Sequence, residues 1–199
     1  MAQATAQPVQ APATPAVADP APLGLAAFAL TTFLLSAKNA GWTHGGDAWL
    51  GYAFAYGGFI QLLAGMWEFR RPNVFGATAF STYGGFWIGL GLYVLLAAPG
   101  STNEANDLGW ILLAFAIFNT YMLLWSARIS GAVFGVFLTL EATEIILFIG
   151  NFSETSGIVK FGGWVGFLTA IVAWYASAAG VVNGMANREV LKVGRPMWK

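Results

Sequence analysis

The sequence predicts an all-α membrane protein with six transmembrane helices per subunit and both termini in the cytoplasm. Apolar residues make up 57% of the 199-residue chain and charged residues only 9%, whereas a soluble domain carries about 25% charged residues. Most of the charge falls in short breaks between long apolar stretches. Both observations favour a lipid environment, and the length is enough for one domain.

The composition also argues against several classes of function. The net charge is zero, so no basic field attracts nucleic acid, and the absence of cysteine excludes disulfides and thiolate chemistry. A single histidine, His44, cannot build a metal site alone. No GxxxxGKS loop or GxSxG elbow occurs. We therefore expect no enzyme activity, no catalytic residue, no metal and no cofactor.

The chain divides into three parts. Residues 1–18 are uncharged and rich in Ala, Pro and Gln, and they lack the basic start and apolar centre of a signal peptide. This composition predicts a disordered N-terminal tail. Residues 19–187 form the predicted six-helix transmembrane domain, and residues 188–199 a short cytoplasmic C-terminal tail.

Each predicted span is long enough to cross the hydrocarbon core, which takes about 20 helical residues. In chain order the six spans are residues 23–41, 48–68, 79–98, 108–126, 130–150 and 161–184. The linkers between them are short, which predicts that consecutive helices are antiparallel neighbours.

The distribution of Lys and Arg predicts the orientation. Six spans place both termini on one side, and seven basic residues fall on that side against two, Lys38 and Lys160, on the other. The seven are Arg70, Arg71, Arg128, Arg188, Lys192, Arg195 and Lys199. Since Lys and Arg collect on the cytoplasmic side, we expect both termini there.

Small residues recur at GxxxG spacing within the spans. The pairs are Gly85/Gly89, Gly131/Gly135, Gly162/Gly166 and Gly180/Gly184. Small residues let helix backbones approach closely in lipid. Two interpretations stay open, packing within one subunit or a tight oligomer as well.

Glu141 and Glu144 are the most unusual residues within a span, and their i, i+3 spacing places them on one helix face. A carboxylate at that depth needs water or a partner, and otherwise favours its protonated form. One interpretation is a proton-coupling or pathway role, in which Glu141 lies deeper. The alternative is a buried protonated acid, bonded to Thr139, Thr143 or a neighbouring helix.

Other polar residues have simpler explanations. Gln61 and Asn119 are candidate pathway residues, but either one alone is explained by a polar link between helices. Glu68, Arg70 and Arg71 lie at a membrane edge, where a surface ion pair accounts for them.

Two sequence blocks carry a family resemblance. "DPAPLGL" at residues 19–25 resembles the NPAPLGL signature of the acetate uptake transporter family, also called the succinate–acetate permease or GPR1/FUN34/YaaH family. "GGFIQLLAGMWEFRRPNVFGATAFSTYGGFW" at residues 57–87 is similar to its Gln–Ala–Gly–Glu segment and the aromatic run that follows. The resemblance covers essentially everything after the tail.

The resemblance implies a plasma-membrane transporter of acetate and related monocarboxylates, with succinate in some members. It implies a hexameric ring of six-helix subunits, each with its own pathway, and leaves carrier and channel mechanisms open. The signature residues are Pro20, Pro22, Leu23, Gly24 and Leu25. The family's apolar constriction corresponds to Phe28, Tyr83 and a fifth-helix leucine, Leu140 with Leu138 as the alternative.

The chain departs from the family pattern at Asp19, which replaces Asn, and at Pro72, which replaces a Gly. Glu141 and Glu144 fall where the family is mostly apolar. Asp19 is predicted to cap the first helix, with Pro20 at the first helical position, and Gly24 to allow close packing of that helix.

Three functions compete. The first is a monocarboxylate transporter, the second a channel for a neutral small solute such as the undissociated acid, and the third a membrane scaffold that transports nothing. A substrate partner is expected in the first two, whereas the bilayer and a homo-oligomer are expected in all three.

Overall fold

The computed structural model describes residues 17–44 and 48–198, so the predicted tail of residues 1–18 lies almost entirely outside the described residues. Among the described residues the secondary structure is helical throughout. The five long helices are α1 (Ala21–Asn39), α4 (Val74–Leu92), α5 (Glu104–Ser126), α6 (Gly131–Phe152) and α7 (Ser156–Ala186). Two short elements, η2 (Tyr93–Ala97) and η3 (Ala98–Gly100), extend α4.

The second predicted span is built from three consecutive helical pieces. These are α2 (Ala48–Tyr52), the π-helical η1 (Ala53–Ile60) and α3 (Gln61–Arg70). Among the described residues, five helices are long and apolar enough to cross a membrane, and the segment of α2, η1 and α3 is not one of them.

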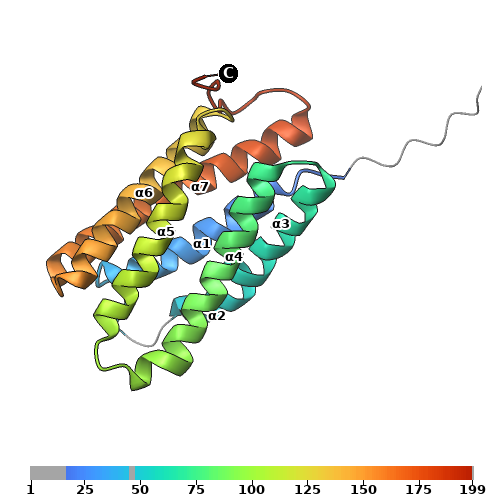
Figure 1. The fold of residues 1–199 in the computed structure, drawn as a ribbon. Helices are drawn as coiled ribbons and strands as arrows, with labels where there is room; N and C mark the ends of the chain where they lie inside the picture. The colour runs from blue at the N-terminus through green and yellow to red at the C-terminus, as the bar shows by residue number, and fades with distance from the viewer. Residues whose placement is uncertain (1–16, 45–47, 199) are drawn as a thin grey trace, which may run out of the picture.

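The helices form a bundle in which they run side by side (Figure 1). Helix α1 packs against α7 on one side and against η1 and α3 on the other. Helices α5, α6 and α7 pack in sequence order, and α3 packs along α4. Helix α1 is therefore the element that joins the two halves.

Close approach between α1 and its neighbours depends on small residues. A Cβ added at Gly24 would lie 2.7 Å from the Phe80 ring of α4, and one at Gly57 would lie 2.6 Å from the Thr31 hydroxyl. The Thr31 hydroxyl donates to the carbonyls of Ala27, 3.0 Å away, and Tyr52, 3.4 Å away. Gly24 thus packs as predicted, and Thr31 ties α1 to the residue that precedes the π-helical turns.

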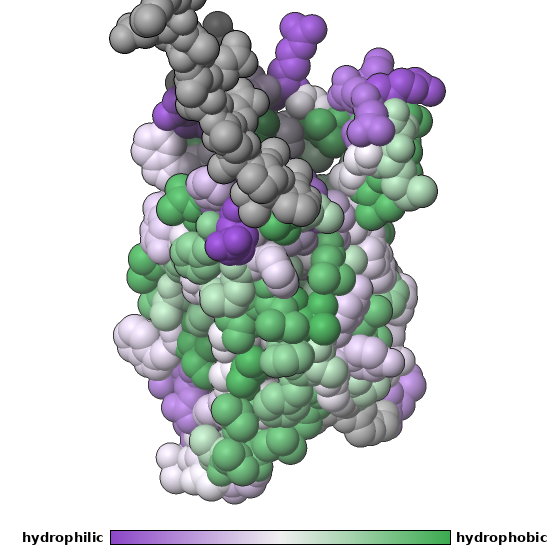
Figure 2. Space-filling view, turned by 90° about the vertical axis from the view of Figure 1, so that its right-hand side faces the viewer, coloured by the Kyte–Doolittle hydropathy of each residue, from purple (hydrophilic) through white to green (hydrophobic). Residues whose placement is uncertain are grey.

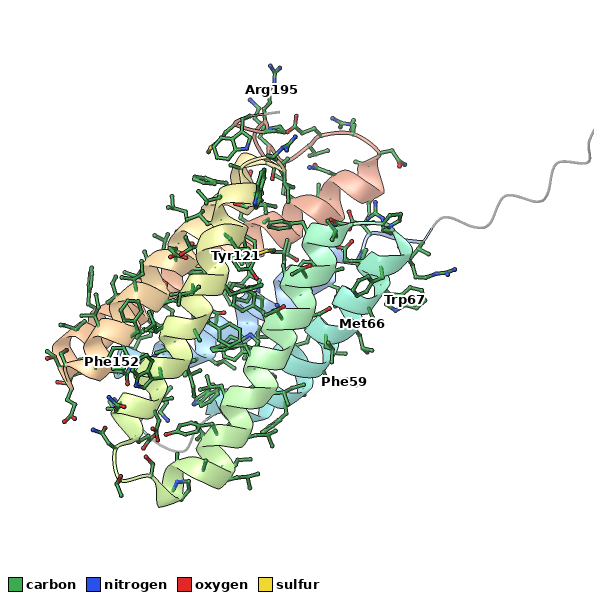
Figure 3. All side chains as sticks on the ribbon, in the orientation of Figure 1. Phe59, Met66, Trp67, Tyr121, Phe152 and Arg195 are labelled. Atoms are coloured by element: carbon green, nitrogen blue, oxygen red, sulfur yellow. The ribbon has the colours of Figure 1, made fainter. Side chains whose placement is uncertain are left out.

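Both described ends of the chain lie at one end of the bundle. Asp19, before α1, pairs with Arg71, after α3, and Met197 donates its backbone N–H to the carbonyl of Ala127, after α5. Arg195 projects from this end (Figure 3). In Figure 2 hydrophilic residues gather at the upper end of the displayed face, above a largely apolar middle. We call this the termini end and its opposite the far end.

The segment after α7 folds back onto the bundle. Asn187 ends the helix in the left-handed region, with φ 51°. The Asn183 side chain bonds to the backbone of Val190 and Leu191, and the Val193 carbonyl accepts from the N–H of Ala132. Residues 188–198, the described part of the predicted C-terminal tail, therefore form a hydrogen-bonded strap across the termini end.

The side of η1 and α3 that faces away from the bundle is apolar. Phe59, Met66 and Trp67 are all exposed there and point outward (Figure 3). An outward row of large apolar side chains on this segment is suited to contact with lipid.

The GxxxG pairs divide into two groups. Cβ atoms added at Gly131, Gly135, Gly162, Gly166 or Gly180 would meet other residues of the same chain, and those at Gly85, Gly89 or Gly184 would meet nothing within 4 Å. Packing within one subunit explains the first group. The exposed pair Gly85/Gly89 on α4 is left without a contact of this kind.

Candidate functional site

Three helices bring the predicted constriction residues together. Phe28 on α1, Tyr83 on α4 and Leu140 on α6 are 5%, 3% and 6% exposed and belong to one apolar cluster. The rings of Phe28 and Tyr83 meet edge to face, with their centroids 5.7 Å apart. Leu138, the alternative to Leu140, is exposed on the outside of α6. We call Phe28, Tyr83 and Leu140 the ring.

The ring separates two cavities, because all three of its residues line both of them. The central cavity, about 40 Å³, lies toward the far end, and its other walls include Thr32, Trp87 and Glu144. The lower cavity, about 20 Å³, lies toward the termini end, and its walls include Leu25 and Gln61.

Each small cavity adjoins a wide mouth through a shared residue. Asn39 lines both the central cavity and a mouth of about 360 Å³ at the far end. Leu25 lines both the lower cavity and a mouth of about 490 Å³ at the termini end. Four spaces thus follow one another through the bundle, and the ring is the narrow point between the two small ones.

The signature residues differ in what they contact. Pro22 lines the termini-end mouth and its carbonyl accepts from the Ser177 hydroxyl of α7, 2.6 Å away. Leu25 reaches the lower cavity, whereas Leu23 is exposed and Pro20 is buried. The signature therefore anchors the start of α1 to its neighbours, and Pro22 and Leu25 are the members that line the series of cavities.

The start of α1 corrects the predicted cap by one residue. The helix begins at Ala21, so Pro20 is the N-cap and not the first helical residue. Asp19 nevertheless accepts the Ala21 N–H at 3.0 Å. It also pairs with the Arg71 guanidinium at 2.7 Å, and the two side chains are 54% and 38% exposed.

The predicted surface ion pair of Glu68 with the neighbouring arginines does not form. Glu68 is fully buried and accepts from the Asn73 amide at 3.0 Å. Asn73 in turn caps α4 by accepting the Gly76 N–H at 3.1 Å. Because Arg71 turns to Asp19, Glu68 serves to hold the turn between α3 and α4.

A hydrogen-bonded chain of polar groups reaches the ring from α5 and α6. The Tyr83 hydroxyl lies 3.0 Å from Asn119 Oδ1 and 3.3 Å from Glu144 Oε1. The Asn119 amide donates to Glu141 Oε2 at 2.6 Å, and Thr120 donates to Glu141 Oε1 at 2.7 Å. Asn119 therefore links Glu141 to the ring tyrosine.

The two glutamates occupy different positions in this chain. Both oxygens of Glu141 have partners on α5, and Glu141 lines none of the four spaces. Glu144 lines the central cavity and its Oε2 has no hydrogen-bond partner. Thr139 and Thr143, the expected partners, bond to backbone carbonyls of α6, and Thr143 also to Thr169. This geometry favours Glu144 over Glu141 as the pathway acid.

Two residues of the central cavity, Thr32 and Trp87, were not among those predicted from the sequence. Neither the Thr32 hydroxyl nor the Trp87 indole N–H has a hydrogen-bond partner. Each lies four positions after a ring residue, Phe28 or Tyr83, so it shares that residue's helix face. Helical spacing from the ring would have identified both.

Charge is distributed unevenly along the cavities. The far-end mouth is lined by two basic side chains, Lys38 and Lys160, and by one acid, Glu154, and the Lys38 ammonium lies 5.7 Å from the centre of the Trp49 ring. No basic side chain lines the central or the lower cavity. An anion would be attracted to the far end but would find no cation near the ring.

Known proteins resemble this chain along most of its length. The sequence profile of the GPR1/FUN34/yaaH family matches residues 2–193. "Acetate permease A" of Emericella nidulans is 39% identical over 91% of this chain and 67% of its own length. "Succinate-acetate/proton symporter SatP" of Escherichia coli K12 is 34% identical over 89% of this chain and 96% of its own.

A solved structure has the same fold. "Structure of the bacterial acetate channel SatP" superposes with a TM-score of 0.85 at 34% identity, over 90% of this chain and 100% of that one. The chain spans 62% of the length of two further fungal relatives. The match therefore includes the whole of the bacterial fold and the greater part of the fungal proteins.

Proposed function

Because the chain belongs to the GPR1/FUN34/yaaH family, we propose that it is a plasma-membrane transporter of acetate and related small monocarboxylates, with succinate as a further candidate substrate. The series of four spaces joined by Asn39, the ring and Leu25 carries the proposal. The transport names of the relatives support it, and the proposal includes no enzymatic reaction.

In the proposed mechanism the substrate enters at the far-end mouth. Two basic side chains line this mouth against one acid, Glu154, and the excess of positive charge raises the local concentration of anions there. The apolar ring then acts as a gate, since a hydrophobic constriction excludes water until it widens. A carboxylate beside the ring meets no basic side chain, so the proposal includes a proton that travels with the acid.

We place six spans across the bilayer, with both termini in the cytoplasm. The segment of η1 and α3 is the sixth span, supported by its outward apolar side chains and its length of helix. Among the described residues, six basic residues belong to segments at the termini end and two to segments at the far end, which supports the orientation.

The proposed assembly is a homo-hexamer with one pathway in each subunit. The exposed pair Gly85/Gly89 on α4 supports a contact between copies, because small residues allow two helices in lipid to pack closely. The pathway lies inside one subunit, so assembly is not needed to build it.

Uptake of labelled acetate into proteoliposomes tests the function directly. We expect saturable uptake that a pH gradient, acidic outside, accelerates. Uptake that rises in proportion to the concentration of undissociated acid, without saturating, would favour a channel for that neutral solute. Uptake no faster than in protein-free liposomes would favour a scaffold.

A further inference from the structure

Three residues that line the central cavity each carry a buried polar atom that has no hydrogen-bond partner. These atoms are Glu144 Oε2, Thr32 Oγ1 and Trp87 Nε1. Their residues are 3%, 6% and 2% exposed and come from three different helices. Since buried polar groups are nearly always hydrogen-bonded, three such atoms around one cavity indicate that the cavity receives a polar group.

Helix geometry places the three groups in one layer. Thr32, Trp87 and Glu144 each lie four residues after a ring member, Phe28, Tyr83 and Leu140 in turn. Helices α1, α4 and α6 all run from the termini end to the far end, so the layer lies about 6 Å from the ring, in the direction of the far end. A molecule held there rests directly on the closed gate.

Thr32 is unusual among the buried threonines. The hydroxyls of Thr31, Thr143 and Thr169 each donate to the carbonyl four residues earlier in their own helix. The Thr32 hydroxyl makes no such bond. It is therefore available as a donor to a group within the cavity.

The chemistry of the layer suits a bound carboxyl group that shares one proton with Glu144. Thr32 and Trp87 supply two donors, and Glu144 supplies an acceptor when ionised or a donor when protonated. Two ionised carboxylates side by side without a cation are unstable, whereas two carboxyl groups sharing one proton leave a single charge. The Tyr83 hydroxyl, 3.3 Å from Glu144 Oε1, contacts the remaining oxygen of that pair.

We propose that Thr32, Trp87 and Glu144 form a binding site for a small monocarboxylic acid, held as a pair with Glu144 that shares one proton. The pair is the same whether the proton arrives on the acid or is already on Glu144. One proton therefore accompanies each acid past the ring. The proposal rests on the proposed transport function and gives it a site and a protonated species.

The groups that face Glu144 are few. Tyr83 of α4 contacts it, and Asn119 of α5 connects Tyr83 to Glu141 of α6. Helix α1 contributes Thr32 and no ionisable side chain to the central cavity, and from α7 Thr169 bonds to Thr143, the neighbour of Glu144. Tyr83 and Glu144 are the ionisable residues that line this cavity. A change in proton content on acid binding is therefore assigned to Glu144 and the bound acid.

Infrared difference spectroscopy of the protein in lipid vesicles tests the site without requiring turnover. Near neutral pH, acetate labelled with the heavy carbon isotope at its carboxyl carbon is compared with unlabelled acetate. We expect the wild type to show a protonated-carboxyl band on binding, part of which shifts with the label. Glu144→Gln should lose the unshifted part, and Glu104→Gln, outside the cavities, should keep it.

Two conservative variants test the donors. Thr32→Val and Trp87→Phe each remove one hydrogen bond, which should raise the half-saturating acetate concentration about fivefold. The matched controls are Thr139→Val, whose hydroxyl bonds only within α6, and Trp164→Phe, an exposed indole. Both controls should leave acetate uptake unchanged.

The outcomes separate this proposal from the transport function. Bound acetate that shows only carboxylate bands in the wild type, or donor variants with unchanged half-saturation, would overturn the shared-proton site while uptake persists. Wild-type protein that takes up no labelled acetate would instead remove the transport function on which the site depends.

Discussion

At the residue scale, Tyr83 belongs to two structures at once. Its ring contacts Phe28 and forms part of the constriction, and its hydroxyl reaches Asn119 and Glu144. A change at this residue therefore alters both the width of the gate and the polar groups beside it. The two effects are separable, because Tyr83→Ala removes the whole aromatic side chain whereas Tyr83→Phe removes only the hydroxyl.

We predict that Tyr83→Ala increases acetate flux and relaxes selectivity against longer monocarboxylates, because it removes the largest side chain of the ring. The measurement is the ratio of butyrate to acetate uptake in proteoliposomes. Trp164→Ala, at an exposed position that lines none of the four spaces, is the control. Equal changes in both variants would contradict a gating role for Tyr83.

Asp19→Asn tests the charge at the termini-end mouth. The Asn still accepts the Ala21 N–H, and the lost ion pair is half-exposed, so the free energy of unfolding should change by less than about 1 kcal/mol. Arg71 is left without its counter-charge, so acetate exchange should become faster at low ionic strength.

Salt provides the check on this prediction. Screening shortens the reach of the Arg71 charge, so the difference from wild type should disappear in high salt. Glu189→Gln is the matched control, an acid at the same end that lies outside the mouth. A difference that persists in high salt would show that Asp19 acts by some route other than its charge.

At the element scale, the length of the apolar runs and the helical periodicity explain which features the sequence predicted. The apolar runs predicted the positions of the five long helices, because about 20 apolar residues in succession are typical of a membrane-spanning helix. The same periodicity would have given the layer above the ring, since Thr32 and Trp87 follow Phe28 and Tyr83 by four residues. The family resemblance placed Phe28, Tyr83 and Leu140, which the structure brings together.

Other features depend on contacts that spacing does not encode. Within the π-helical turns of residues 53–60, Gly57 packs closely against Thr31, a contact between segments far apart in sequence. The i, i+3 spacing placed Glu141 and Glu144 on one helix face but did not indicate which of them lines the cavity. In the structure the Asn119 amide of α5 donates to Glu141, and Glu144 is the one that lines the central cavity.

The C-terminal strap depends on one side chain of α7. Asn183 makes three hydrogen bonds to the backbone of Val190 and Leu191. We predict that Asn183→Ala lowers the free energy of unfolding by about 1–3 kcal/mol, since it leaves backbone groups unpaired, and that it makes residues after 187 sensitive to proteases. Asn151→Ala, which loses only a bond within α6, should leave this segment protected.

At the scale of the whole molecule, the bundle satisfies most of its small-residue contacts internally. Helix α1 joins two halves, and the proposed pathway lies between them, so a single subunit contains every residue assigned to it. The outer face of α4 carries the GxxxG pair in which both glycines are open, Gly85 and Gly89, with Leu92 exposed beside them. This face is where a second copy is expected to pack.

We predict that Gly85→Leu combined with Gly89→Leu converts the oligomer to smaller species while leaving the subunit folded. Neither added side chain meets an atom of its own chain, because an added Cβ finds nothing within 4 Å at either position. Between two copies, however, the same side chains would hold the α4 backbones apart, since close helix approach in lipid depends on small residues.

Native mass measurement from membranes or mild detergent gives the number of subunits in each species. Gly157→Leu, at an equally open glycine at the start of α7, should keep the wild-type mass. Because the pathway lies within one subunit, the separated subunits should still take up acetate in proteoliposomes, and loss of uptake together with loss of the oligomer would mean that neighbouring copies complete the conduit.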